Sequence, residues 1–441
     1  MIADDCTYLD MEVYGGQAKT PNLNKLAKEG LTFNRCFQTA PMCSPTRHNI
    51  YTGLYPVRSG AWPNHTRVYP GTKSIVHYLG DSGYRVALSG KSHISPREAF
   101  PFEYSTDFSK NQPETRPFFP NLKKFIAQCR SSETPFCLVA CSNEPHSPYT
   151  MGDPSAYPPE SLKLPPSWVD TPATRASYSK YLAEITYYDW QYGALLSLLD
   201  DFGLRDDTLV IVVSEQGSAF PFAKWTCFEM GLASGMIARW PGKVKAGTST
   251  NALVEYVDLV PTFIEAAGAT PEDLDGKSFL PVLLGDSSEH KKYTYGLQTT
   301  RGIINGSDAY GIRSCGNARY RYIRNLHPEA IFTNAVTRKG GDGKANFWVS
   351  WQEKAANGDP HAKAMVKKYQ RRPSEELYDV VKDPHCLVNL IENASLAGVR
   401  EELSNQLDDW MKSQGDKGAA TEEMAHTRKA NFNRNKKRKN N

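Results

Sequence analysis

The sequence predicts an α/β sandwich, with helices on both faces of a central sheet, followed by a smaller α+β unit. Short apolar runs bounded by turn residues alternate with helical periodicity through the first two-thirds of the chain, which is typical of strand–helix–strand units. Residues 209–213 are five apolar residues in a row, as expected of a parallel strand buried on both faces. With 441 residues, 40% of them hydrophobic, the chain can bury a sizeable core.

The expected elements follow from these two patterns. Residues 1–5 read as the last residues of a strand whose beginning is missing, so we expect a shortened first strand and no secretory leader. The other expected strands are 84–88, 136–141 and 209–213, and the expected helices are 22–29, 74–79, 174–202 and, near the end, 397–411. After about residue 290 the sequence pattern changes, and short β-rich segments follow at 293–298, 310–313 and 320–324.

These patterns divide the chain into three parts. We expect a first unit over residues 1–290, an α+β subdomain over 291–413, and a basic, disordered tail over 414–441. The last fourteen residues hold seven Lys or Arg and no acid, so the net charge of 52 − 48 = +4 becomes 45 − 48 = −3 without them. Such a tail can touch any polyanion, but a solvated tail is favoured, because no nucleic-acid-binding motif accompanies it.

Other classes of protein are excluded by composition. No apolar run approaches the ~18 residues that a membrane-spanning helix needs. The nine cysteines are odd in number and contain no Cys-x-x-Cys pair, which argues against a disulfide framework and against a zinc site.

Polar side chains follow four of the expected strands. In open α/β sheets ligands bind beyond the carboxyl ends of the strands, so these residues are the first to inspect. They are Asp4-Asp5, Gly90-Lys91-Ser92-His93, Asn143-Glu144-Pro145-His146 and Glu215-Gln216-Gly217. Carboxylate and amide oxygens suit Ca²⁺ or Mg²⁺ better than a transition metal. The alternative is that acids and amides at strand ends are solvated turn formers or helix caps.

The sharpest motif is Cys43-Ser44-Pro45-Thr46-Arg47, followed by a helix-like run to Gly53. Cys-x-Pro-x-Arg is the pattern found in sulfatases, where the cysteine is oxidised to formylglycine. The alternative is a buried cysteine that opens a helix, with Arg47 solvated.

The chain resembles the sulfatase family over almost its whole length. Beside the cysteine motif, the resemblance rests on Asp4-Asp5, Thr20-Pro21-Asn22-Leu23, Gly30-Leu31-Thr32-Phe33, Gly83-Tyr84-Arg85, Gly90-Lys91-Ser92-His93, Asn143-Glu144-Pro145-His146, Ala223-Lys224-Trp225, Val257-Asp258-Leu259-Val260-Pro261-Thr262, Asp275-Gly276-Lys277-Ser278 and Glu376-Leu377-Tyr378-Asp379. Residues 90–96 and 100–102 are most similar to N-sulfoglucosamine sulfohydrolases and related polysaccharide sulfatases. The family usually has Asp and then Asn or His where this chain has Glu215 and Gln216.

The resemblance implies an alkaline-phosphatase-like α/β/α sandwich and a catalytic sulfatase domain over residues 1–290. It implies that the enzyme hydrolyses sulfate esters or N-sulfo groups of a sulfated saccharide, after a formylglycine-generating enzyme has converted Cys43. Ca²⁺, with Mg²⁺ as the alternative, would be held by Asp4, Asp5, Cys43, Glu215 and Gln216. The family is expected in the periplasm or outside the cell.

The resemblance also implies catalytic roles. Glu215 would be the base for the attacking hydroxyl, and Arg47 would hold the formylglycine hydrate. Lys91 and Lys224 would neutralise charge on the sulfuryl oxygens. His146, with Lys224, would protonate the leaving atom, and His93 would take the proton that triggers sulfate release.

Weaker candidates and two alternative functions stay open. Asn64, His65 and Arg67 lie just beyond the cysteine helix and could contact the sugar, or they form a solvated loop. Trp225 stacks on a sugar ring or packs in the core, and the core is favoured. The alternative functions are a phosphoester or phosphonate hydrolase of the same superfamily, and a catalytically silent polysaccharide-binding protein, which the change at Glu215-Gln216 motivates.

Overall fold

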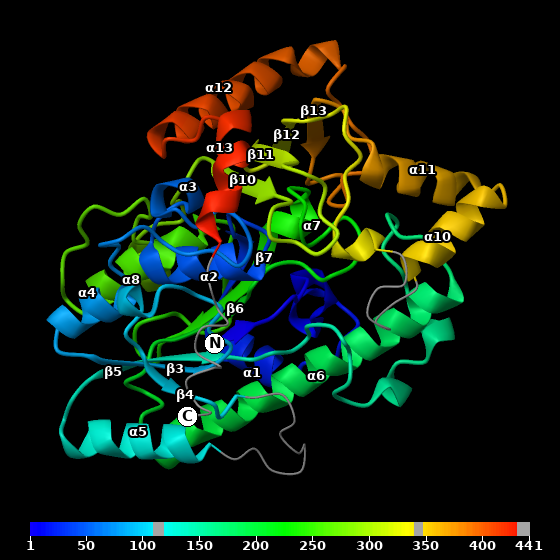
Figure 1. Ribbon diagram of the computed structural model, residues 1–441. Helices are drawn as coiled ribbons and strands as arrows, with labels where there is room; N and C mark the ends of the chain where they lie inside the picture. The colour runs from blue at the N-terminus through cyan, green and yellow to red at the C-terminus, as the bar shows by residue number, and fades with distance from the viewer. Residues whose placement is uncertain (109–118, 339–346, 430–441) are drawn as a thin grey trace, which may run out of the picture.

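The computed structural model describes residues 1–108, 119–338 and 347–429. In these ranges a large mixed sheet and a smaller antiparallel sheet are surrounded by helices (Figure 1). The large sheet has the strand order β4-β3-β5-β1-β6-β7-β2-β8, with β9 also paired to β2. Its strands are β1 (Ile2–Ala3), β2 (Leu31–Phe37), β3 (Arg85–Gly90), β4 (Glu103–Ser105), β5 (Phe136–Cys141), β6 (Val210–Ser214), β7 (Ala233–Arg239), β8 (Thr248–Thr250) and β9 (Val254–Glu255).

The short strand β1 lies in the middle of this sheet and is parallel to both neighbours. Ile2 pairs with Cys141 of β5 and with Val213 of β6. β7 runs antiparallel to β6 and to β2, so the sheet is mixed rather than fully parallel. The carboxyl ends of β3, β5, β1 and β6 therefore meet at one edge of the sheet. The polar residues that follow these strands lie together there, as expected from the sequence.

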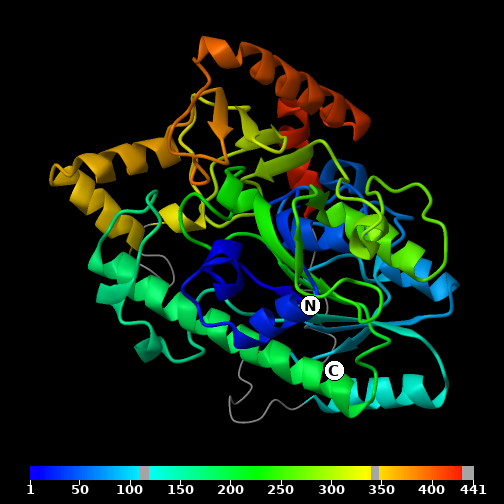
Figure 2. The same ribbon diagram turned by 180° about the vertical axis from the view of Figure 1, so that it is seen from behind.

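Both faces of the sheet are covered, because alternate residues of β6 belong to different cores. Val210 and Val212 pack with α1 (Pro21–Glu29) and α6 (Pro172–Asp201), while Ile211 and Val213 pack with α2 (Cys43–Thr52), α4 (Ile75–Asp81) and α8 (Leu259–Ala266). α5 (Pro120–Ser131) packs beside α6 on the first face. The two helical layers are separate in both views (Figures 1 and 2). This arrangement is the predicted α/β sandwich.

The second sheet has the order β10-β11-β12-β13 and is antiparallel throughout. Its strands are β10 (Thr294–Thr299), β11 (Gly311–Gly316), β12 (Tyr320–Asn325) and β13 (Glu375–Asp379). The remaining helices are α3 (Pro56–Ser59), α7 (Glu229–Leu232), α9 (Leu280–Leu284), α10 (Phe347–Ala356), α11 (Pro360–Gln370), α12 (Ala397–Ser413) and α13 (Ala419–Met424). The division at residue 290 stays a prediction, and the second sheet begins four residues after it.

The prediction of a disordered tail from residue 414 is wrong for residues 414–429. This segment contains α13 and the 3₁₀ helix Ala425–Arg428, and two of its acids are fully buried. The Arg313 guanidinium of β11 donates to Asp416 Oδ2 (2.5 Å) and to Glu422 Oε1 (2.8 Å). The prediction relied on the polar composition of the segment, which does not show that these acids pair with an arginine about a hundred residues upstream. Residues 430–441 lie outside the described residues.

None of the helices that the structure describes combines the length and apolarity needed to cross a bilayer. A cavity of about 560 Å³ lies among apolar residues such as Met1, Leu138 and Ile211, at the ends of the strands opposite to the polar residues. It contains none of the predicted site residues.

Candidate active site

The predicted strand-end residues meet around Cys43. Backbone hydrogen bonds fix the loops, since Asp4 N donates to Glu144 O (3.0 Å) and Glu215 N donates to Ala3 O (2.9 Å). The loops after β1, β5 and β6 are thus joined at the edge where their strands end. All of Asp4, Asp5, Glu215 and Gln216 are buried.

Cys43 is the first residue of α2, a helix in which all ten residues are buried. Its Sγ receives hydrogen bonds from Lys224 Nζ at 3.1 Å and from Gln216 Nε2 at 3.5 Å. The same sulfur lies 3.7 Å from Oδ1 of both Asp4 and Asp5. The N-terminus of a helix carries partial positive charge, so it favours an anionic group at residue 43.

Three ion pairs surround the sulfur. Lys224 Nζ lies 2.5 Å from Asp5 Oδ1, and Arg47 Nε lies 2.5 Å from Glu215 Oε1. Lys91 Nζ pairs with Asp4 Oδ2. When all six groups are ionised, the three carboxylates and the three cations balance in charge, so a divalent cation would add two positive charges to the cluster.

The charges and burial of this cluster shift several pKa values. Burial disfavours ionisation of the Cys43 thiol, but Lys224 and Lys91 outweigh it and hold the pKa of the thiol below its usual value. Burial also raises the pKa of Asp4, but Lys91, His146, Glu215 and Arg47 together outweigh it and leave that pKa well below its usual value. For Glu215 burial wins over the attraction of Arg47, and the pKa is raised.

The residues present fit a hard divalent cation. Carboxylate oxygens of Asp4, Asp5 and Glu215 and the Cys43 sulfur lie within 4.8 Å of one another. Gln216 is fully buried, and its Oε1 accepts no hydrogen bond from the residues that the structure describes. A buried acceptor without a donor is costly, and a cation would satisfy it. The donors are oxygens of the kind that Ca²⁺ and Mg²⁺ prefer.

Both predicted histidines lie at the cluster. His146 Nε2 is 3.7 Å from Asp5 Oδ2, and its Nδ1 lies 2.7 Å from Ser147 O. Burial, followed by the charge of Lys91, holds the pKa of His93 well below its usual value, so the ring is neutral at neutral pH.

Left-handed backbone conformations gather at this site. Asp5 (φ 62°), His65 (φ 53°), His93 (φ 51°) and Trp225 (φ 66°) are among the non-glycine residues with positive φ. Such conformations cost of order 1–3 kcal/mol each and persist where the surrounding structure enforces them.

The weaker substrate candidates divide into two groups. Asn64 Nδ2 donates to Gly302 O at 3.5 Å, and His65 Nδ1 lies 3.0 Å from the same carbonyl. The His65 ring is 4.9 Å from the His93 ring, so this loop reaches the edge of the cluster. Arg67 is exposed, and its carbonyl accepts a hydrogen bond from Arg428 Nη2.

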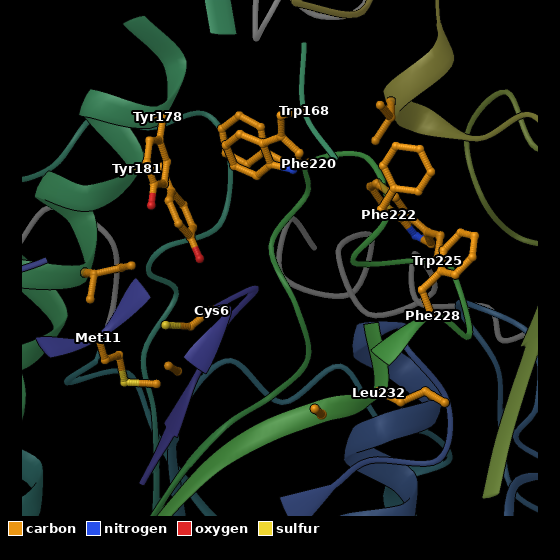
Figure 3. Packing of buried hydrophobic residues seen from close by; sticks show 14 of the residues in the cluster. Cys6, Met11, Trp168, Tyr178, Tyr181, Phe220, Phe222, Trp225, Phe228 and Leu232 are labelled. Carbon is orange, nitrogen blue, oxygen red and sulfur yellow. The ribbon is translucent and has the colours of Figure 1, made fainter. Parts of the chain in front are cut away.

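Trp225 packs in the core, as favoured from the sequence. The residue is 9% exposed, and its side chain lies near Phe222 and Phe228 (Figure 3). The Lys224 ammonium sits 4.9 Å from the centre of the indole ring. The tryptophan therefore supports the lysine that contacts Cys43.

Sequence reasoning missed Glu184 of α6. Its Oε1 accepts from Thr150 N (2.5 Å) and Met151 N (3.1 Å), just after the loop that bears His146. Burial and, next, the nearby Glu144 raise its pKa to about 9, so Glu184 is protonated at neutral pH. The signal available in the sequence was an acidic residue on the apolar face of the long helix predicted for residues 174–202.

The sulfatase family model matches residues 1–269, and a model of the C-terminal region of N-sulphoglucosamine sulphohydrolase matches residues 217–332. A similar curated protein is the ulvan-active sulfatase of Formosa agariphila, with 32% identity over 94% of this chain and 80% of that protein. Human N-sulphoglucosamine sulphohydrolase is 25% identical, over 93% and 88% of the two chains. A solved structure described as a complex with its substrate D-glucosamine-2-N,6-O-disulfate has a TM-score of 0.69 at 18% identity, covering 95% of this chain and 98% of that one.

Proposed function

Because this chain belongs to the sulfatase family and is a sulfuric ester hydrolase of alkaline-phosphatase-like fold, we propose that it desulfates a saccharide through a formylglycine at position 43 and one divalent cation. The bond cleaved is a sulfate ester or an N-sulfo bond. The observation that carries the proposal is the Cys43 sulfur, buried at a helix N-terminus between two lysine ammoniums and three carboxylates.

Asp4, Asp5, Glu215, Gln216 and residue 43 would hold the cation, with Ca²⁺ preferred and Mg²⁺ as the alternative. When bound, the cation would polarise a sulfate oxygen and favour ionisation of a hydroxyl at residue 43. Glu215 and Gln216 are each one methylene longer than the family's usual Asp and Asn, but they keep the oxygen donors. The unbonded Oε1 of Gln216 supports this assignment.

Conversion of Cys43 to an aldehyde would require a formylglycine-generating enzyme. The aldehyde hydrate supplies two hydroxyls, one to attack sulfur and one whose deprotonation expels sulfate as the carbonyl re-forms. A thiol lacks this second hydroxyl, so its sulfur adduct would not turn over. That Lys224 and Lys91 lower the pKa of the Cys43 thiol, against the effect of burial, supports a site that stabilises negative charge at this position.

The remaining side chains act on protons and charge. Glu215 would accept the proton of the attacking hydroxyl, and Arg47, whose Nη2 has no hydrogen-bond partner in the described ranges, would hold that hydroxyl in place. Lys91 and Lys224 would neutralise the sulfuryl oxygens. His146 would protonate the leaving atom, and His93 would take the proton that releases sulfate, each worth roughly 10²–10⁴-fold.

The saccharide class is inferred from the relatives that act on ulvan or on N-sulphoglucosamine. Asn64 and His65 would contact the sugar next to the sulfate, and the 4.9 Å distance between the His65 and His93 rings supports this. Arg67 would pair with a carboxylate or a second sulfate further out.

The test is sulfate release by protein co-expressed with a formylglycine-generating enzyme, from an aryl sulfate and from defined sulfated saccharides. We expect turnover of sulfate, no more than a small fraction of that rate on the matching aryl phosphate, and loss of at least 10³-fold with Cys43→Ala. Mass spectrometry across residue 43 should find the aldehyde. Unchanged desulfation by Cys43→Ala, or a preference for phosphate, would overturn the proposal.

A further inference from the structure

The loop after β5 carries His146, and its first residues are fixed at two points. Ser142 Oγ donates to Gln191 Oε1 of α6 (2.8 Å) and accepts from Glu144 N (3.0 Å). The Glu144 carbonyl in turn accepts from Asp4 N (3.0 Å). The backbone before His146 is therefore held both by α6 and by the end of β1.

The same loop is fixed a second time where Glu184 of α6 meets it. Glu184 is fully buried, and its Oε1 accepts from Thr150 N (2.5 Å) and from Met151 N (3.1 Å). The next residue, Gly152, has a φ of 72°, and a Cβ there would lie 2.2 Å from the carbonyl oxygen of Ala183. The glycine thus lets the loop approach α6 closely enough for the Glu184 side chain to reach both N–H groups.

Glu184 makes these contacts as a neutral carboxylic acid. Burial and, next, the charge of Glu144 raise its pKa to about 9. The two side chains form a hydrogen bond, and two carboxyl groups can do so only when one of them carries the proton. Glu184 therefore uses both of its oxygens on the loop, one as an acceptor from the backbone and one as a donor to Glu144.

His146 lies between these two anchors, and its ring moves with the loop. Nδ1 lies 2.7 Å from the carbonyl oxygen of Ser147, so the ring is held by its own stretch of backbone. Nε2 faces the cluster and lies 3.7 Å from Asp5 Oδ2. Since a displacement of ~1 Å in a reaction centre can cost about 10²-fold in rate, the position of this loop matters for proton transfer.

We propose that Glu184 is a positioning residue, which ties the loop of His146 to α6 and so fixes the imidazole beside the leaving atom. The proposal rests on the proposed function, because Glu184 acts through the proton that His146 gives to the leaving atom. It assigns to α6 a part in the reaction, although Glu184 itself touches neither the substrate nor the sulfur at position 43.

The loop has further contacts that do not depend on Glu184. The Tyr149 ring packs edge-on against Tyr181 of α6, with 5.5 Å between ring centres, and lies parallel to the Phe220 ring at 6.2 Å. The bond between Ser142 and Gln191 also stays in place. We therefore expect Glu184→Ala to fold and to loosen only this anchor of the loop.

The test compares Glu184→Ala with Glu184→Gln, whose amide keeps both an acceptor and a donor. Asp189→Ala is the matched control, because Asp189 is a buried acid of the same helix that accepts from two backbone N–H groups of α1. The matured proteins are assayed on 4-nitrophenyl sulfate, whose leaving group needs no proton, and on phenyl sulfate, whose more basic leaving group does. His146→Ala and the double variant of His146 and Glu184 complete the set.

We expect Glu184→Ala to lower kcat/KM at least 10²-fold on phenyl sulfate but less than tenfold on 4-nitrophenyl sulfate, as His146→Ala should. Glu184→Gln should stay within about threefold of wild type on both esters, and Asp189→Ala should change both by one common factor. The double variant should be no slower than His146→Ala, because the two residues act on one proton transfer.

Hydrogen exchange of the unmatured protein gives a second measurement that needs no activity. The amides of Thr150 and Met151 should exchange at least tenfold faster in Glu184→Ala, and at the wild-type rate in Glu184→Gln and Asp189→Ala. Glu184→Asp, which is one methylene shorter, should give the same pattern as Glu184→Ala if the alanine variant fails to fold.

The proposal is overturned if Glu184→Ala slows both esters equally, if Glu184→Gln behaves like Glu184→Ala, or if the double variant shows the product of the two single losses. Unchanged exchange at Thr150 and Met151 also overturns it. If matured wild type hydrolyses neither ester, or if His146→Ala slows both equally, the proposed function or the role of His146 is wrong, and hydrogen exchange still decides whether Glu184 holds the loop.

Discussion

Cys43 acquires its chemistry from side chains that are distant in the sequence. The motif predicted the residue, and the resemblance predicted Asp4, Asp5, Lys91, Glu215 and Lys224 as its neighbours. Which cation pairs with which carboxylate was not predictable, because it depends on how far each side chain extends across the edge of the sheet. That the Nε of Arg47 pairs with Glu215, while its Nη2 has no partner in the described residues, is one such detail.

The Arg47–Glu215 pair makes a prediction about stability. Both side chains are fully buried, so Glu215→Ala leaves the guanidinium buried without its anion. We expect a loss of ~3–5 kcal/mol in the free energy of unfolding, measured by urea denaturation. Glu103→Ala, which breaks an exposed pair with Arg85, is the control and should cost at most about 1 kcal/mol. Equal losses in the two variants would contradict the prediction.

Divalent cations should stabilise the folded protein. A ligand that binds only the folded state adds ~2.7 kcal/mol at a concentration 100 times its Kd. We expect Ca²⁺ to raise the melting temperature of protein treated with a chelator. In Asp4→Asn or Gln216→Ala, the same rise should need at least tenfold more Ca²⁺. Gln128→Ala, on the exposed face of α5, should respond like wild type. A shift that survives in both site variants would place the cation elsewhere.

At the scale of elements, α1 depends on a partner helix for its cap. Thr20, the residue before α1, makes no side-chain cap, and Asp189 of α6 replaces it. Asp189 Oδ1 accepts from Leu23 N (2.8 Å), and its Oδ2 accepts from Asn22 N (3.1 Å). The periodicity predicted both helices, but a cap from another helix has no local sequence signal.

Asp189 also predicts a dependence of stability on pH. Burial raises its pKa to about 6 in the folded protein, above the ordinary value of 3.8. The folded state therefore binds more protons than the unfolded state between about pH 4 and 6, and stability from this group is lost as the pH rises through that window. Urea denaturation should show that the free energy of unfolding of wild type falls by up to ~3 kcal/mol more than that of Asp189→Asn between pH 4 and pH 7.

Asp200→Asn, an exposed change at the end of the same helix, should follow the wild-type pH profile. If Asp189→Asn keeps the full pH dependence, the group does not titrate as expected. A separate variant, Asp189→Ala, should lose about 1–2 kcal/mol in unfolding free energy at pH 4, because the cap is removed, and should lack the pH dependence that Asp189 gives to wild type.

At the scale of the molecule, residues 414–424 pack against the second sheet and supply the acids that pair with its buried Arg313. Asp416 and Glu422 enclose the Arg313 guanidinium, which is fully buried. α12 packs on β11 and β12, and α13 continues from it toward the loop at Thr66 (Figure 1). The C-terminal segment thus links the smaller sheet to the active-site edge.

Truncation distinguishes this arrangement from a disordered tail. Ending the chain at Ser413 removes both acids and leaves Arg313 buried without an anion, so we expect a loss of at least ~3–5 kcal/mol in unfolding free energy or failure to fold. Ending it at Lys429 removes no contact that the structure describes, and the melting temperature should be unchanged. If the chain that ends at Ser413 is as stable as the one that ends at Lys429, the buried triad does not contribute.

The sequence by itself predicted the α/β sandwich, the family, the helices α1, α2, α4, α6 and α12 and several central strands, and it named the residues of the candidate active site. These follow from periodicity and from short motifs, which are local properties of the chain. Only the tertiary structure decided which cation pairs with which carboxylate, that Asp189 caps α1, and that the basic C-terminus begins beside His65. Each of these joins residues more than a hundred positions apart in the chain or separated by several elements, and such contacts arise from packing, which no local pattern encodes.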